Sequence, residues 1–127
     1  MRDHPAKGER LLIWIGSSKR ALLRFPPAVV RDIGADLSVA QYGGTALSAK
    51  VWKGHGAGVL EIVEDFDRAT YRAVYTVRFT RAIYVLHCFQ KKSPSGVRTA
   101  KQDIDLIDKR LLDARADYEK RYGKGAT

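Results

Sequence analysis

The amino-acid sequence predicts one α+β domain with the element order β-α-α-β-β-β-α, in which helices flank a small, mostly antiparallel sheet. Three segments rich in β-branched and aromatic residues follow one another between residues 59 and 90, separated by short turns, as is typical of an antiparallel meander. Segments whose apolar residues recur at helical spacing precede and follow this meander. Because 127 residues suit a single domain, we expect a flexible arm over residues 1–9, the domain over residues 10–123 and a tail over residues 124–127.

The N-terminal part is predicted to contain one strand and a helix hairpin. The apolar run at residues 10–15 (RLLIWI) is the expected strand, and the turn residues 16–18 (GSS) precede a short helix that ends near residue 25. Pro26 and Pro27 break this helix, and Pro27 suits the first turn of the next one. The second helix shows an apolar stripe and stops before two glycines: Val30, Ile33, Leu37 and Ala40, then Gly43 and Gly44.

The remainder is predicted to hold the meander and a final helix. A glycine-rich connection over residues 43–57 leads into the three strands, which are expected at residues 59–66, 71–79 and 83–90. After the turn SPSG (residues 93–96), Thr99 and Gln102 form a capping box for a helix from about residue 100 to residue 122. Its stripe alternates steps of three and four and ends before Gly123: Ile104, Ile107, Leu111, Ala114 and Tyr118.

Composition limits the classes of function. A net charge of +9, from 23 basic and 14 acidic residues, favours a polyanionic partner such as nucleic acid, although a basic domain can also be basic only for solubility. The single cysteine, Cys88, excludes an intramolecular disulfide and lies in an apolar run, which indicates a buried thiol. No run is long and apolar enough for a membrane span, and the polar N-terminus lacks a signal core. We therefore expect a cytoplasmic protein without a membrane partner.

The positive charge is concentrated in one part of the chain. Residues 70–102 carry seven basic residues and no acid: Arg72, Arg78, Arg81, Lys91, Lys92, Arg98 and Lys101. Alternation along the strand places Arg72 and Arg78 on one face, and the lysine pair follows the next strand. This predicts a cationic patch at one end of the sheet that suits phosphate contacts. An alternative is a solvated sheet face whose arginines pair with Glu61, Glu64 or Asp65.

An ordered set of short matches resembles the RelE/ParE superfamily of toxins, in its HigB-like, phage-derived branch. The matches are Glu61, Tyr71-Arg72 with Tyr75, the segment LHCFQKK at residues 86–92, and Thr99-Ala100-Lys101. The resemblance covers residues 58–120 well, and residues 10–45 only in the order of their elements. Ala100 stands where the family commonly has proline. No single match is very specific, but the ordered set is fairly specific.

The resemblance implies a RelE-like fold and ribosome-dependent cleavage of mRNA without a metal or other cofactor. In that chemistry Arg72 would hold the scissile phosphate, and Lys92 with Lys91 would stabilise the transition state. His87 and Tyr75 are weaker candidates; a histidine can serve as an acid or a base, but His87 alternates with apolar residues, and a core histidine fits as well.

One departure concerns the first strand of the meander. The RelE branch carries lysines there as general base and phosphate binder, whereas this strand reads VLEIVE, with Glu61 near one of their positions. Glu61 could act as a general base or as a structural partner of Arg72. The loop residues Lys53 and His55, together with Arg78 and Arg98, are further candidates for RNA contact, and Trp52 could stack on a base; an ordinary mobile loop is the alternative for residues 52–55.

Partners follow from the same resemblance. They are the ribosome with its mRNA and a cognate antitoxin, which in such pairs is often a helix-turn-helix protein; the apolar hairpin over residues 25–42 is one possible docking face. Two other functions stay open: a ParE-like toxin that binds DNA gyrase, and a non-catalytic nucleic-acid-binding phage accessory protein. The codon preference, oligomeric state, antitoxin class and identity of the general base are left undetermined, as is whether the toxin is active or degenerate.

Overall fold

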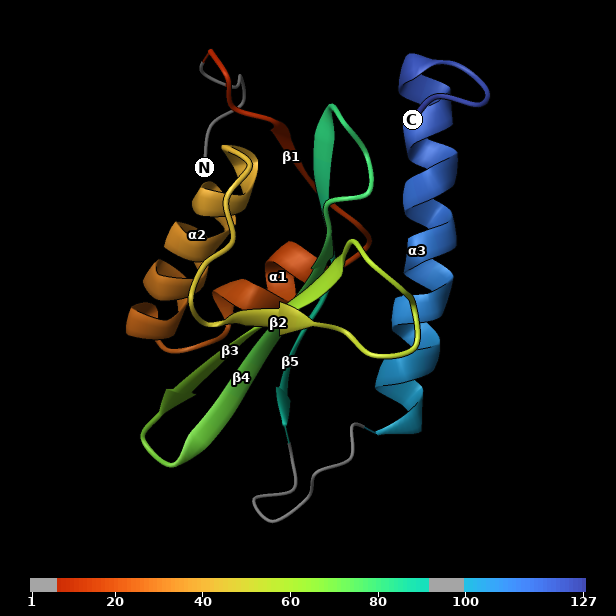
Figure 1. The fold of residues 1–127 in the computed structure, drawn as a ribbon. Coiled ribbons are helices and arrows are strands. Elements are labelled where there is room, and N and C mark those ends of the chain that lie inside the picture. The colour runs from red at the N-terminus through yellow and green to blue at the C-terminus, as the bar shows by residue number, and fades with distance from the viewer. Residues whose placement is uncertain (1–6, 92–99) are drawn as a thin grey trace.

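The computed structural model describes residues 7–91 and 100–127 and confirms the α+β class (Figure 1). The elements are β1 (Leu11–Trp14), α1 (Ser18–Leu23), α2 (Pro27–Gln41), β2 (Ala49–Val51), β3 (Val59–Phe66), β4 (Ala69–Thr76), β5 (Ala82–Lys91) and α3 (Lys101–Tyr122). Pro27 opens α2 as expected, because its fixed φ suits a first helical turn. The predicted turn at residues 93–96 and Thr99 lie outside the described residues. The predicted capping box is wrong, because the N-cap of α3 is Ala100 and no side chain of the described residues caps the helix.

The strands form one five-stranded sheet in the order β1-β5-β4-β3-β2. β3, β4 and β5 make the predicted antiparallel meander, and β1 lies parallel to β5 at one edge. β2 is an addition to the predicted order, because it lies inside the segment expected to be a glycine-rich connection. It is only three residues long and pairs antiparallel with β3, with Lys50 opposite Glu61. A strand this short is specified by the free edge of β3 rather than by a sequence pattern.

Helices cover both faces of the sheet, with α1 and α2 on one face and α3 on the other (Figure 1). The apolar stripe of α2 is buried at Ile33, Leu37 and Ala40 as predicted, but its first buried residue is Val29 rather than Val30. The α3 side is buried through Ile107, Ala114 and Tyr118 together with sheet residues such as Tyr84 and Leu86. Burial of a leucine or isoleucine such as Leu86 or Ile107 contributes about 1.5–3 kcal/mol to the stability of the fold. The two helical layers therefore hold the sheet between them.

Two local features decide which side chains reach the α3 side. A β-bulge interrupts the pairing of β4 with β5: Val74 lies opposite His87, but Tyr75 lies opposite Val85. Leu86 therefore has no partner on β4, and His87 faces the same side of the sheet as Val74. Arg110 of α3 fastens this bulge by donating from Nη1 to the carbonyl oxygen of Leu86 at 2.9 Å.

The last residues of the chain lie against the body of the domain. Residues 124–127, the predicted tail, follow α3, and the carbonyl oxygen of Thr127 accepts a hydrogen bond from the Thr80 N–H at 3.2 Å. Arg115 donates to the carbonyl oxygen of Ala126 at 2.7 Å. These contacts join the last residues to α3 and to the segment that links β4 and β5.

Candidate anion-binding site on the sheet

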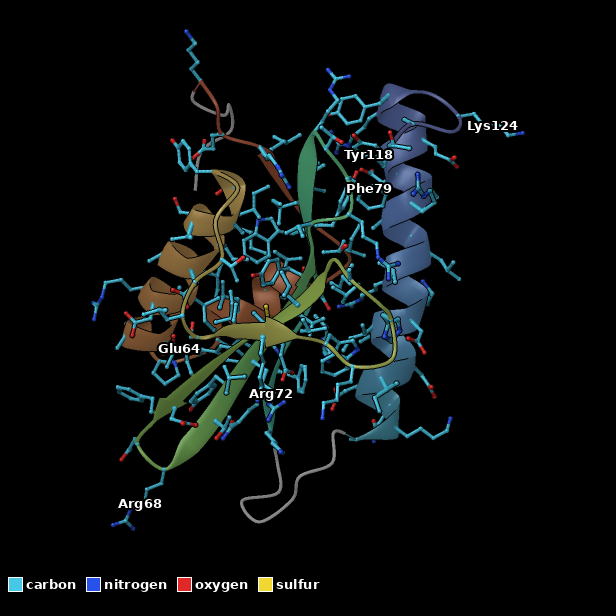
Figure 2. The ribbon with its side chains drawn as sticks, viewed as in Figure 1. Glu64, Arg68, Arg72, Phe79, Tyr118 and Lys124 are labelled. Carbon is cyan, nitrogen blue, oxygen red and sulfur yellow. The ribbon has the colours of Figure 1, made fainter. Side chains whose placement is uncertain are left out.

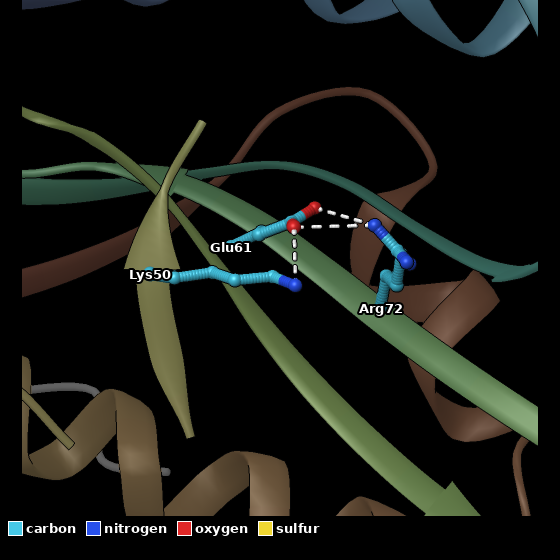
Figure 3. A network of polar contacts seen from close by, with 3 residues as sticks. All are labelled: Lys50, Glu61 and Arg72. Carbon is cyan, nitrogen blue, oxygen red and sulfur yellow. Dashed lines mark hydrogen bonds and ion pairs between the residues drawn. The ribbon is translucent and has the colours of Figure 1, made fainter. Parts of the chain in front are cut away.

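Three charged side chains from the neighbouring strands β2, β3 and β4 meet on the face of the sheet that α3 covers (Figure 3). Arg72 Nη1 donates to both carboxylate oxygens of Glu61, at 3.1 and 3.0 Å, and Lys50 Nζ lies 3.7 Å from Glu61 Oε1. Register explains the meeting, because Lys50 pairs with Glu61, and Glu61 pairs with Val74, two residues from Arg72 on the same face. The predicted candidates Glu61 and Arg72 are therefore joined, together with a lysine that the sequence did not single out.

The network is buried at its centre and open at one side. The side chains of Glu61 and Arg72 are 6% and 12% exposed, whereas that of Lys50 is 62% exposed. One carboxylate faces two cations, which leaves a local excess of positive charge. Arg72 Nε is also buried without a partner among the described residues. Lys50 is accessible to an anion from solvent, whereas the buried Nε could serve one only after Glu61 moves.

His87 lies on the same face and pairs with Val74, two residues along β4 from Arg72. Its Nε2 is 2.8 Å from Asp103 Oδ1 on the first turn of α3, and its ring stacks on Phe89 with centroids 4.8 Å apart. Burial lowers the pKa of His87, although the Asp103 carboxylate opposes this shift. The neutral ring donates from Nε2 to Asp103, which leaves Nδ1 as a buried lone pair without a partner among the described residues. The ring is thus held in a defined orientation, largely below the surface.

Lys91 is the last residue of β5 and shares this face with Arg72. It pairs with Thr70 in the register, and Phe89, two residues earlier, pairs with Arg72. Lys91 therefore extends the cationic face to the end of β5. Lys92 and Arg98, two further candidates, lie outside the described residues.

A second group of candidates lies apart from Arg72. Arg78 follows the far end of β4, roughly 20 Å along the chain from Arg72. Its Nε donates to the Ala57 carbonyl oxygen at 3.2 Å, and its Nη2 donates to the His55 carbonyl oxygen. His55 Nε2 in turn contacts the Asp108 carboxylate on α3. Arg78 and His55 thus fasten the loop over residues 52–58, and the exposed Lys53 belongs to the same loop.

Three further residues have no part in the site. Tyr75 is fully buried on the opposite face, among the residues that pack on α2, and burial raises the pKa of its hydroxyl to about 12. Cys88 is buried on that face too, and burial raises the pKa of its thiol to about 12, which makes it a poor nucleophile. Trp52, proposed above to stack on a base, is buried in the α3-side core.

Two residues of the site, Lys50 and Asp103, were not predicted from the sequence. Lys50 had no recognisable signal, because β2 itself was not predicted. Asp103 could have been noticed as an acid in the first turn of a helix, but its pairing with His87 depends on how α3 crosses the sheet.

A cavity in the described part of the chain lies elsewhere. It has a volume of about 510 Å³ and opens between β1 and α2, on the hairpin side of the sheet. Among residues 7–91 and 100–127 there is no group of three or more potential ligands arranged to hold a metal ion. No helix in those ranges is long and apolar enough to cross a membrane.

Comparison with known proteins gives one match. Residues 20–112 match the family described as phage-derived protein Gp49-like (DUF891). The matched region runs from α1 into α3 and includes the whole network of Lys50, Glu61 and Arg72, together with His87 and Asp103. No curated protein and no solved structure matches the chain.

Proposed function

The chain belongs to the Gp49-like family of phage-derived proteins, a RelE/HigB-like toxin family, and on this basis we propose that it is a toxin that cleaves mRNA on the ribosome. The observation that carries the proposal is Arg72, which contacts Glu61 through Nη1 alone and has Lys50 and Lys91 on the same face of the sheet. Such a face suits a phosphodiester, and a net charge of +9 suits an RNA-rich target.

The proposed reaction is transesterification within the RNA strand. The ribose 2′-oxygen attacks the adjacent phosphorus, the O2′–P bond forms and the P–O5′ bond breaks, which gives a 2′,3′-cyclic phosphate and a free 5′-hydroxyl. Arg72 binds the phosphate oxygens, and Lys91 with Lys92 stabilises the charge that develops on them. A base removes the 2′-hydroxyl proton and an acid protonates the leaving 5′-oxygen, each contributing about 10²–10⁴ in rate.

Two groups are candidates for the base. The carboxylate of Glu61 contacts Arg72 and would therefore lie beside a phosphate bound there. His87 carries a free lone pair at Nδ1 and an orienting carboxylate, Asp103, but this nitrogen is buried. We favour Glu61, because its carboxylate contacts Arg72 directly; its side chain, 6% exposed, must turn outward to meet the 2′-hydroxyl.

Growth and mRNA 5′-end mapping test the proposal. Wild-type protein is expressed from an inducible promoter in a bacterial host, beside Arg72→Ala, Lys91→Ala and Lys92→Ala. Lys124→Ala serves as a control of equal charge at the far end of α3 (Figure 2). We expect growth arrest with new 5′-ends inside translated frames for the wild type and the control, and loss of these ends for the three site variants.

Other outcomes distinguish the alternative functions. Arrest without new mRNA ends would contradict the nuclease and support a ParE-like toxin that acts on DNA gyrase. Normal growth in a host without a related antitoxin would support an inert nucleic-acid-binding phage accessory protein, or a degenerate toxin.

The proposed partner is a cognate antitoxin of the helix-turn-helix class that neutralises the toxin in the cytoplasm. The α1–α2 side carries the cavity between β1 and α2, and it lies across the sheet from Arg72, so an antitoxin there would leave the network uncovered. Co-expression with the product of a neighbouring small helix-turn-helix gene should restore growth, and continued arrest would argue against this partner.

A further inference from the structure

We propose that Lys50 and Arg72 form a single phosphate-binding cradle, and that Glu61 is a built-in anion that fills this cradle until RNA enters. The inference rests on the proposed function only in naming RNA as the source of the phosphate. It assigns a substrate-binding role to Lys50 and a gating role to Glu61.

The ion pair between Arg72 and Glu61 uses only one nitrogen of the guanidinium group. A structural arginine–carboxylate pair commonly uses two guanidinium nitrogens in a parallel fork. Here Arg72 reaches both oxygens of Glu61 through Nη1, and Nε has no partner among the described residues. The fork is therefore incomplete, and once Glu61 is displaced the guanidinium can offer more donors to an anion that has more oxygens than a carboxylate.

Lys50 has a fixed backbone and an exposed side chain beside the ion pair. Its backbone is fixed, because Lys50 pairs with Glu61 in β2 and the next residue but one, Trp52, donates its N–H to the Val59 carbonyl oxygen at 2.9 Å. Its side chain is exposed and only 3.7 Å from the carboxylate. The ammonium group can therefore turn from Glu61 to an incoming anion without any change in the sheet.

A phosphate and the Glu61 carboxylate would compete for the same cations. A phosphate bound between Lys50 and Arg72 would lie beside the Glu61 carboxylate, and like charges at that distance repel. Phosphate must therefore displace Glu61 from Arg72. A displaced Glu61 is freed from its cationic partner next to the ribose, where it can accept the 2′-hydroxyl proton. Loose RNA in solution would bind poorly under this competition, whereas RNA already positioned by the ribosome would displace Glu61.

Titration with inorganic phosphate, followed by NMR, tests the cradle without ribosomes or cleavage. We expect Glu61→Gln to bind phosphate about tenfold more tightly than wild type, which corresponds to removal of about 1.4 kcal/mol of competition. In the Glu61→Gln background, Lys50→Ala should lower the affinity severalfold, and Lys124→Ala should leave it unchanged. Equal or weaker binding by Glu61→Gln would show that Glu61 is only a structural partner of Arg72 and would overturn the gate.

Folding and the proposed function are controlled separately. Thermal unfolding establishes that each variant is folded. Should Glu61→Gln not fold, Lys50→Ala in the wild-type background still decides the cradle, because Lys50 is exposed; equal affinity in Lys50→Ala and Lys124→Ala would refute the role of Lys50. Phosphate binding as predicted, in a protein that produces no mRNA ends, would retain the cradle and reject the nuclease.

Discussion

Removal of Arg72 should weaken the fold as well as the proposed chemistry. Arg72→Ala leaves the Glu61 carboxylate, 6% exposed, without its closer cation. Breaking a buried ion pair in this way costs about 3–5 kcal/mol, and since Lys50 stays 3.7 Å from the carboxylate, we expect about 2–3 kcal/mol here. A domain of this size is stable by about 5–15 kcal/mol, so the variant should fold with a reduced margin.

Urea unfolding followed by tryptophan fluorescence measures this loss. The decisive comparison is with Glu61→Gln and with the double variant Arg72→Ala/Glu61→Gln, which removes the uncompensated charge. We expect the double variant to be more stable than the sum of the single losses predicts, by about 1–2 kcal/mol. A loss below about 0.5 kcal/mol for Arg72→Ala, with additive single losses, would refute the reasoning, because the pair would then behave like one at the surface.

Three further predictions concern the scaffold and His87. Asp67 and Arg68 form the β3–β4 turn at positive φ, and Arg68 has a φ of 67°, so Arg68→Gly should raise the free energy of unfolding by about 0.5–1 kcal/mol. Arg24→Gly, at a φ of −84°, should lower it, and equal effects in urea unfolding would contradict this. Because burial lowers the pKa of His87, the unfolded chain binds a proton first, so stability should fall as the pH drops below about 6.5. His87→Gln should flatten that part of the pH profile, and an unchanged profile would assign the dependence elsewhere. Gly58→Ala should destabilise the domain more than Gly54→Ala, since both have positive φ but only at Gly58 would a Cβ lie 2.6 Å from an arginine side chain; equal melting temperatures would argue against that contact.

Much of the fold follows from local patterns. The order of the helices and of the three meander strands could be predicted from the sequence. Proline breaks, helical apolar stripes and β-branched runs are local signals, each contained in a few neighbouring residues. The candidate pair Glu61 and Arg72 could also be named from sequence, through the family resemblance and the strand alternation. Whether Glu61 contacts Arg72 was left open, since that depends on the register between β3 and β4.

Tertiary structure alone decided the rest of the site. Lys50 enters it only because a three-residue strand pairs with the free edge of β3, and such a strand has no periodicity of its own. His87 is oriented by Asp103 only because a bulge turns it toward α3. Arg78 was predicted on the same strand as Arg72, but β4 ends at Thr76, and the Arg78 donors hold the loop over residues 52–58. Sequence determines which side chains are available on each face, and long-range pairing determines which of them meet.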